Sequence, residues 1–179
     1  MKMDYTVAMQ RAIALAEKGL GKTAPNPIVG AVIIDATGAI VAEGFHDRNT
    51  SKDHAEIVAI KAAGEKSKGS TIVVTLEPCN HTGNTGPCVQ AIIDAGITTV
   101  VFAVSDPNEK AAGGAAALRA AGITVVEGVL KDEAAFANRA WLMKIRKNRP
   151  FFTWKVAATL DGKVAAADGT SKWISNEAS

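Results

Sequence analysis

Hydrophobic residues recur three and four positions apart along residues 4–20, and this spacing predicts an amphipathic helix. Residues 23–27 contain two prolines and cannot continue that helix, so they are expected to form a loop. Two apolar, β-rich stretches follow at residues 28–34 and 39–45, separated by the turn-forming sequence Asp-Ala-Thr-Gly. This pattern is typical of a β-hairpin.

From His54 onward, helical stretches alternate with short apolar stretches that resemble buried strands. Such alternation favours an α/β fold, a three-layer αβα domain with helices on both faces of one sheet. The initial hairpin makes this a mixed sheet of about five strands. Helices are predicted at about residues 54–63, 87–95, 111–121 and 132–145, and strands at 71–76, 99–104 and 124–127.

The composition changes at residues 148–150, which are Asn-Arg-Pro. A new apolar stretch over residues 151–160 predicts a strand, and residues 161–162 predict a turn. Thirty residues cannot form a second hydrophobic core. We therefore expect one domain at residues 1–147, followed at residues 148–179 by a linker and the truncated start of another domain.

The 179 residues are 47% hydrophobic and carry a net charge of +2. This charge is too small to indicate a nucleic-acid or membrane partner, and no apolar run is long enough to span a bilayer. The start of the chain does not resemble a signal peptide, so we expect a cytoplasmic protein. In a reducing compartment its two cysteines, Cys79 and Cys88, are more consistent with a metal site than with a disulfide.

Three short motifs carry the candidate chemistry: His-Ala-Glu at residues 54–56, Pro-Cys ending at Cys79, and Pro-Cys ending at Cys88. One imidazole and two thiolates are suitable ligands for a zinc ion whose fourth position is left to water. Zinc lowers the pKa of such a water, so that hydroxide is available near neutral pH. A structural zinc site usually has four protein ligands, and His81 is the candidate for a fourth unless it faces substrate.

Glu56 lies two residues after His54 and is the candidate proton carrier between the attacking water, a ring nitrogen and the leaving ammonia. His-x-Glu followed by Pro-Cys-x-x-Cys is the signature of zinc deaminases, with that glutamate as general acid and base. Here eight residues separate Cys79 from Cys88 instead of two. The longer loop would overhang the zinc and influence which substrate fits.

The chain resembles the bifunctional deaminase/reductase family of riboflavin biosynthesis, a branch of the cytidine-deaminase-like superfamily. The resemblance is carried by the long loop between the cysteines and by the sequences TLEPCNH and GPC around them. It extends to PNPIVG at residues 25–30, GFH at 44–46 and DPN at 106–108. The tail, with RPF at 149–151, TLDGK at 159–163 and SKWIS at 171–175, is similar to the opening of the family's NADPH-dependent reductase domain.

The resemblance implies zinc-dependent hydrolytic deamination of diaminohydroxyphosphoribosylaminopyrimidine, a phosphorylated pyrimidine. It implies one Zn²⁺ per chain, NADP only in the missing reductase domain, and no reductase activity from this chain. It also suggests a homo-oligomer. By position, the catalytic residue is Glu56 and the zinc ligands are His54, Cys79 and Cys88. Asn26 and His46 would contact the pyrimidine, His81 and Asn84 the phosphate side, and Asp106 and Asn108 the sugar hydroxyls.

Two departures from the family pattern affect the expected substrate. Residue 84 is Asn where the family usually has Lys or Arg, so phosphate affinity is expected to be weaker unless Lys22 or another base substitutes. The loop over residues 46–54 is one residue longer than usual and lacks a common glycine. The alternative to a substrate-binding role is that Asn26, between two prolines, is only a turn residue and that Asp106-Pro107 is only the entry to a helix.

Two alternative functions are compatible with the sequence. The first is another small-molecule or tRNA base deaminase of the same superfamily, although Tyr5 is the only tyrosine and few aromatic side chains are available to stack on bases. The second is a catalytically silent, zinc-stabilised oligomerisation module. Such a module has no need of Glu56.

Overall fold

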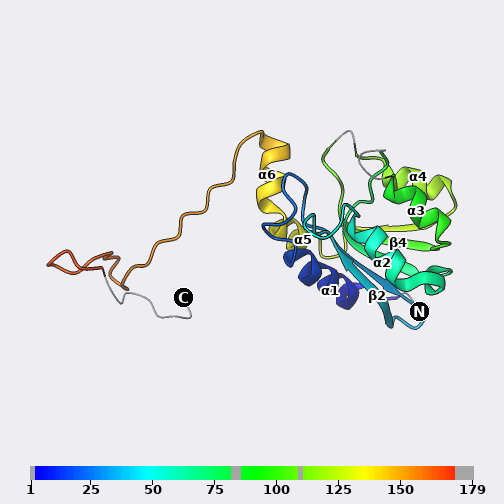
Figure 1. Cartoon of the computed structure of the whole chain (residues 1–179), viewed down its shortest axis with the longest axis horizontal. Helices are drawn as coiled ribbons and strands as arrows, with labels where there is room; N and C mark the ends of the chain where they lie inside the picture. The colour runs from blue at the N-terminus through cyan, green and yellow to red at the C-terminus, as the bar shows by residue number, and fades with distance from the viewer. Residues whose placement is uncertain (1–2, 82–85, 109–110, 172–179) are drawn as a thin grey trace.

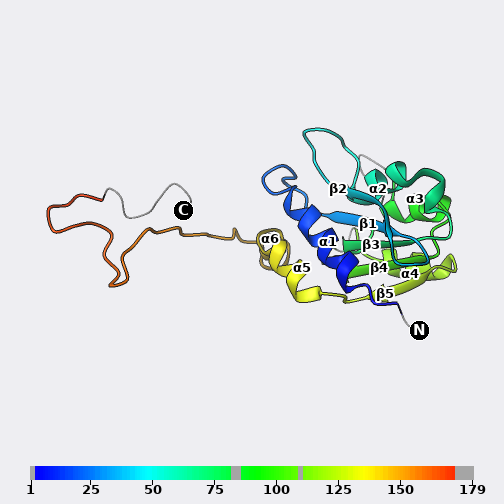
Figure 2. The same ribbon diagram turned by 90° about the horizontal axis from the view of Figure 1, so that it is seen from below.

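A five-stranded mixed sheet forms the centre of the molecule (Figures 1 and 2). The computed structural model describes residues 3–81, 86–108 and 111–171. The strand order is β2-β1-β3-β4-β5; β1 is antiparallel to both of its neighbours, and β3, β4 and β5 are parallel. The strands are β1 (Gly30–Ile34), β2 (Ile40–Phe45), β3 (Thr71–Leu76), β4 (Thr99–Val104) and β5 (Thr124–Glu127). The expected mixed sheet is therefore confirmed.

Helices cover both faces of this sheet, which gives the three layers predicted from the sequence (Figure 2). One face carries α2, α3 and α4, and the other carries α1, α5 and α6. The helices are α1 (Thr6–Glu17), α2 (Ala55–Ala63), α3 (Cys88–Asp94), α4 (Gly114–Ala120), α5 (Lys131–Ala137) and α6 (Arg139–Lys147), and a short 3-10 helix, η1 (Gly64–Ser67), follows α2.

Alternation along the central strands divides the core into two halves. Ile33 of β1 packs with the α2 side, whereas its neighbours Val32 and Ile34 pack with the α1 side. The same alternation separates Phe102 from Val101 in β4. Successive side chains of a strand point to opposite faces, so a sheet covered on both sides needs apolar residues at every position. This explains why the strands read as continuous apolar runs in the sequence.

The directions of the strands bring several loops to one edge of the sheet. Because β1 is antiparallel to β2 and β3, the strands β2, β3 and β4 all point the same way. Their carboxyl ends therefore lie at one edge, together with the loop that leads into β1. In open α/β sheets, ligand sites form outside this edge.

Two glycines allow helices to approach the sheet closely. A Cβ atom on Gly30 would lie 2.0 Å from the carbonyl oxygen of Ala12 in α1. A Cβ atom on Gly44 would lie 2.4 Å from the carbonyl oxygen of Ala55 and 2.6 Å from the backbone nitrogen of Ala59, both in α2. Real Cβ atoms essentially never make such short contacts. Glycine is therefore required at residues 30 and 44, where α1 packs against β1 and α2 packs against β2.

Two sequence predictions are wrong at the C-terminal end. The single helix expected over residues 132–145 is two helices, α5 and α6, which meet at Asn138, where φ is −93° and ψ is 14°. The strand expected over residues 151–160 is absent: this exposed segment runs away from the domain and pairs with no described strand (Figure 1). A strand requires a hydrogen-bonded neighbour. The predicted turn is present, because the backbone N–H of Gly162 donates to the Thr159 carbonyl at 2.9 Å.

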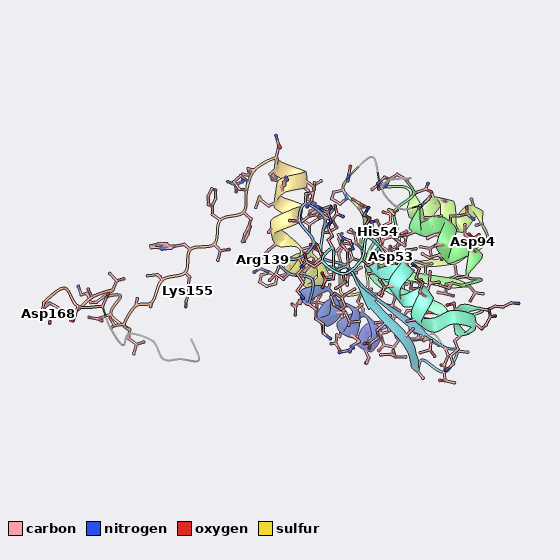
Figure 3. The ribbon with its side chains drawn as sticks, viewed as in Figure 1. Asp53, His54, Asp94, Arg139, Lys155 and Asp168 are labelled. Carbon is pink, nitrogen blue, oxygen red and sulfur yellow. The ribbon has the colours of Figure 1, made fainter. Side chains whose placement is uncertain are left out.

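Side chains that follow α6, including Lys155 and Asp168, lie far from His54 in the domain (Figure 3). Within the described residues, no helix combines the length and the apolar character needed to cross a bilayer.

Candidate metal centre and adjoining pocket

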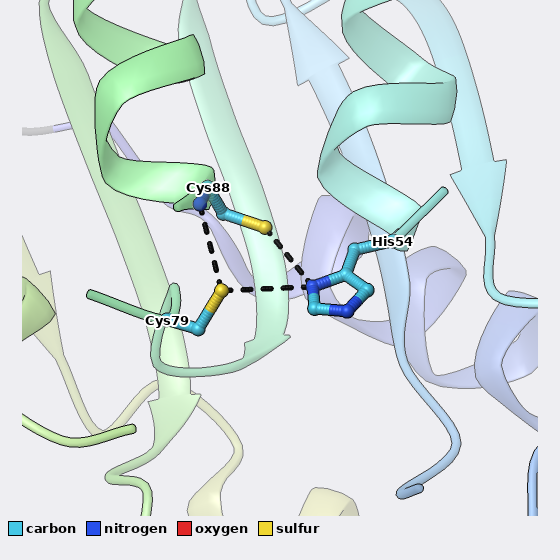
Figure 4. Close-up of side chains that lie close together, drawn as sticks. All are labelled: His54, Cys79 and Cys88. Carbon is cyan, nitrogen blue, oxygen red and sulfur yellow. Dashed lines mark hydrogen bonds between the residues drawn. The ribbon is translucent and has the colours of Figure 1, made fainter. Parts of the chain in front are cut away.

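One histidine and two cysteines converge at the edge of the sheet where the strands end (Figure 4). His54 immediately precedes α2, Cys88 begins α3, and Cys79 follows the end of β3. Nδ1 of His54 lies 3.2 Å from Sγ of Cys88 and 3.6 Å from Sγ of Cys79. The three ligand atoms all lie within 4.8 Å of one another, and both thiols are buried and unpaired by a disulfide.

Backbone hydrogen bonds hold the two cysteine segments against each other. The N–H of Cys88 points at Sγ of Cys79 at 3.5 Å, and the N–H of Val89 donates to the Cys79 carbonyl at 3.3 Å. The start of α3 therefore lies directly over the turn that follows β3. This contact brings Cys79 and Cys88 together across the long intervening loop.

Hydrogen bonds among His54, Cys79 and Cys88 shift the pKa values of all three side chains in a way that suits a cation site. A hydrogen bond from the Cys88 thiol is the main cause that lowers the pKa of Cys79, to about 4, although burial acts in the opposite direction. The same hydrogen bond and burial raise the pKa of Cys88. The hydrogen bond to Cys79 is also the main cause that raises the pKa of His54. Thiolate character thus concentrates at Cys79, with two proton donors beside it, and metal binding displaces such protons.

Glu56 lies on the first turn of α2, beside the His/Cys/Cys cluster, and its side chain is only 4% exposed. Burial raises the pKa of its carboxyl group, while the charge of His54 acts in the opposite direction. A carboxyl group with a raised pKa exchanges protons more readily near neutral pH than an exposed glutamate does. The position and environment of Glu56 therefore suit proton transfer.

A pocket of about 550 Å³ opens next to the cluster. This volume is in the range of small-molecule binding sites. Its walls come from the loop before β1, the β2–α2 loop, the segments after β3 and β4, and one side of α6. The lining residues include Asn26, His46, Arg48, Lys52, His54, Glu56, Glu77, Cys79, His81, Asp106, Asn108, Trp141 and Ile145.

Hydrogen bonds set the orientation of His46 and Asn26 in this pocket. Nδ1 of His46 lies 2.8 Å from the carbonyl oxygen of Asp53, which can only accept, so Nδ1 carries the proton. Nε2 then accepts from Nδ2 of Asn26, 3.4 Å away. Burial lowers the pKa of His46, and the positive charges of His54 and Arg48 act in the same direction. Because Nδ1 donates and Nε2 accepts, His46 is a neutral imidazole that fixes the direction of the Asn26 amide.

Glu77 organises the wall of the pocket formed by the segment after β4. One carboxylate oxygen accepts the backbone N–H of Asp106 at 3.1 Å, and the other accepts that of Ala115 at 2.9 Å. Oδ1 of Asp106 in turn accepts the backbone N–H of Asn108 at 2.8 Å. Burial raises the pKa of Asp106. Glu77 thus holds both the Asp106 turn and the start of α4.

The structure brings most of the site residues predicted from the sequence to one place. Asn84 lies outside the described residues, and Lys22 pairs with Asp47 at 3.6 Å and is not part of the pocket lining. The sequence analysis missed Glu77, although a carboxylate between a buried strand and the Pro-Cys motif was a usable signal. It also missed Arg48, Lys52, Trp141 and Ile145. The pocket is bordered by Glu56, His54 and Cys79, and Cys88 completes the His/Cys/Cys cluster behind it. The predicted substrate contacts that line this pocket are Asn26, His46, His81, Asp106 and Asn108.

Comparison with known proteins agrees with this geometry. Residues 3–104 match the family described as "Cytidine and deoxycytidylate deaminase zinc-binding region". The chain is 51% identical over 172 residues to the riboflavin biosynthesis protein RibD of Mycobacterium tuberculosis, and 46% identical over 177 residues to that of Escherichia coli. These alignments cover 96% and 98% of this chain but only 50% and 47% of the relatives. The chain thus spans about half the length of the relatives it matches.

A solved structure of similar fold comes from Thermotoga maritima, where the protein is described as a diaminohydroxyphosphoribosylaminopyrimidine deaminase/5-amino-6-(5-phosphoribosylamino)uracil reductase. The two superpose with a TM-score of 0.89 at 47% sequence identity. The match covers 96% of this chain and 50% of the other. The cytidine-deaminase-like fold expected from the sequence is therefore confirmed.

Proposed function

Because the chain belongs to the cytidine and deoxycytidylate deaminase zinc-binding family, we propose that it hydrolyses an exocyclic amino group of diaminohydroxyphosphoribosylaminopyrimidine with release of ammonia. The observation that carries the proposal is the buried carboxyl group of Glu56 at the junction of the His/Cys/Cys cluster and the pocket. The substrate follows from the relatives, which match nearly all of this chain and act in riboflavin biosynthesis.

Zinc is the metal that fits the donor set of His54, Cys79 and Cys88. A tetrahedral zinc site separates a nitrogen ligand from a sulfur ligand by about 3.6 Å. The distances from Nδ1 of His54 to the two sulfur atoms, 3.2 and 3.6 Å, are close to this value. When bound, zinc supplies a Lewis acid that makes a water molecule easier to deprotonate.

Glu56 is proposed to carry protons during the reaction. It takes a proton from the attacking water and delivers it to the ring nitrogen next to the amino-bearing carbon. The carbon–oxygen bond forms first, and the carbon–nitrogen bond then breaks. A second proton passes through the same carboxyl group to the leaving amine, so that water and the amine become a carbonyl group and ammonia. The raised pKa of Glu56 suits it to act both as base and as acid.

The remaining lining residues are proposed to orient the substrate. The neutral His46 aims the amide of Asn26 at the pyrimidine, which needs donors and acceptors in fixed directions. Asp106 and Asn108 are proposed to bind sugar hydroxyls, and His81 to face the phosphate side. Residues 1–147 would carry the deaminase and residues 148–179 would lead to a reductase-like part, so the described residues are not expected to bind NADP or to act as a reductase.

The test is ammonia release from the phosphorylated diaminopyrimidine by zinc-loaded protein, comparing the wild-type chain with Glu56→Gln. Glutamine keeps the shape of the side chain but cannot exchange protons, so turnover is expected to fall by about 10²-fold or more. Zinc content and thermal stability are expected to be retained. Unchanged turnover in Glu56→Gln would refute the mechanism, and zinc binding without turnover by the wild type would favour a silent module.

A further inference from the structure

The proposed substrate carries a phosphate group, whose negative charge the protein has to bind. A phosphate monoester carries nearly two negative charges at neutral pH, and proteins bind it with cations or with several N–H donors. The described pocket lining includes three carboxylates, Glu56, Glu77 and Asp106. Residue 84, which lies outside the described residues, is an uncharged asparagine. The groups that bind the phosphate must therefore be sought among the other side chains of the lining.

Two cationic side chains occur in the described lining, and both lie on the β2–α2 loop: Arg48 and Lys52. This loop spans residues 46–54. It begins at His46, which orients Asn26, and ends at the metal ligand His54. A phosphate held by this loop would therefore lie beside both the ring-binding residues and the metal cluster.

Neighbouring charges leave these two cations uncompensated. The acidic residues of the same loop are already paired with other lysines: Asp47 lies 3.6 Å from Lys22, and Asp53 lies 2.6 Å from Lys61. Among the ion pairs of the described residues, none includes Arg48 or Lys52. The loop thus presents net positive charge to the pocket although it contains as many acidic as basic residues.

Arg48 is exposed, but its guanidinium is hydrogen-bonded to the neighbouring loop. Its Nη1 donates to the carbonyl oxygen of Ala24 at 2.8 Å, so the guanidinium rests against the loop that carries Asn26. The N–H groups on Nε and Nη2 have no partner among the described residues. Two N–H groups along one edge of a guanidinium match two oxygens of a phosphate.

We propose that Arg48 and Lys52 form the binding site for the phosphate group of the substrate, with Arg48 as the directional contact and Lys52 as a second charge. This assignment rests on the proposed function, since it specifies the phosphate side of the same pocket. It makes the β2–α2 loop, rather than residue 84, the element that selects phosphorylated substrate.

The kinetic test compares the phosphorylated substrate with its dephosphorylated form in Arg48→Ala, Lys52→Ala and the double variant. KM for the phosphorylated substrate is expected to rise about tenfold or more in the double variant. The kcat value is expected to change little, because the lost contacts stabilise the bound substrate and the transition state equally. KM for the dephosphorylated substrate is expected to stay the same. The control is Lys66→Ala, which removes an exposed lysine of η1 that is not part of the pocket lining.

A structural role of Arg48 would give a different result. Loss of its contact with Ala24 would disturb Asn26 and raise KM equally for both substrates, and that outcome would overturn the proposal. An unchanged KM for the phosphorylated substrate in the double variant, or an equal effect of Lys66→Ala, would also overturn it.

Binding of ribose 5-phosphate to the full chain, measured by calorimetry against ribose, tests the site without turnover. Weaker binding by about tenfold in the double variant supports the proposal, and equal binding by both proteins overturns it. If the wild type binds ribose 5-phosphate through these residues but releases no ammonia, the phosphate site stands and the proposed deamination fails.

Discussion

The side-chain amide of Asn138 satisfies both backbone groups of Ile28, which lies 110 residues earlier in the chain. The N–H of Ile28 donates to Oδ1 of Asn138 at 3.0 Å, and Nδ2 of Asn138 donates to the Ile28 carbonyl at 2.7 Å. Asn138 is 5% exposed and lies at the junction of α5 and α6. Ile28 follows the loop that carries Asn26. The α5–α6 junction therefore fixes one wall of the pocket.

Replacing Asn138 with Ala is expected to destabilise the fold by roughly 2 to 4 kcal/mol, because it leaves two buried backbone groups of Ile28 without a partner. Urea denaturation monitored by circular dichroism measures this change. Asn49→Ala, at an exposed position, is the control and should change stability by less than about 0.5 kcal/mol. Equal stability of the Asn138 variant and the wild type would show that water replaces the amide.

Replacing Gly44 with Ala is expected to cost about 1 to 3 kcal/mol and to weaken zinc binding. The new methyl group would overlap the backbone of α2 and push away the helix that begins next to His54 and carries Glu56. Zinc affinity, measured by competition with a chromophoric chelator, should fall together with thermal stability. Gly86→Ala is the matched control, because a Cβ atom there meets no atom within 4 Å. A Gly44 variant with wild-type zinc affinity would contradict this coupling.

Removal of the metal is expected to abolish ammonia release and to lower stability. A ligand present at a thousand times its Kd stabilises the folded state by about 4 kcal/mol, so chelation should produce a large fall in Tm. Metal analysis is expected to give one zinc per chain, and Cys79→Ala or Cys88→Ala should bind none tightly. Full activity of a chelated, metal-free sample would refute the assignment.

Asp106→Asn is expected to stabilise the protein at neutral pH while weakening substrate binding. Burial raises the pKa of this carboxyl group in the folded state, so the folded protein holds the proton more tightly than the unfolded chain does. The resulting destabilisation is absent below the unfolded pKa, grows as pH rises toward the folded pKa, and is constant above it. When Tm is measured from pH 3 to 8, it should therefore fall less steeply in the variant than in the wild type as the pH rises from the unfolded to the folded pKa of Asp106. Parallel profiles for the two proteins would contradict it.

The sequence predicts the strands better than the ends of the helices. The bounds of β3, β4 and β5 match the prediction because uninterrupted β-branched runs between polar turns leave few alternatives. The helix predicted over residues 4–20 is shorter at both ends, Thr6–Glu17, since helix termini depend on local capping. The convergence of His54, Cys79 and Cys88 also follows from the sequence, because each lies at a strand end or a helix start that the topology brings to one edge.

Other features depend on tertiary contacts that no local pattern contains. The pattern around Asn138 predicts a helix interior, whereas in the structure this residue lies between α5 and α6 and its amide is hydrogen-bonded to Ile28. Arg48 and Lys52 lie on a polar loop whose course determines whether their side chains face solvent or the pocket. Hydrophobic periodicity carries no information about that direction.

The contact between Asn138 and Ile28 also has a consequence for the order in which the site is completed on the ribosome. His54, Glu56, Cys79 and Cys88 are all synthesised before residue 90, and the whole sheet before residue 128. The partner of Ile28 emerges only later. A nascent chain that has reached the end of β5 therefore contains all three residues of the His/Cys/Cys cluster but still lacks Asn138, the residue that holds the Asn26 loop through Ile28.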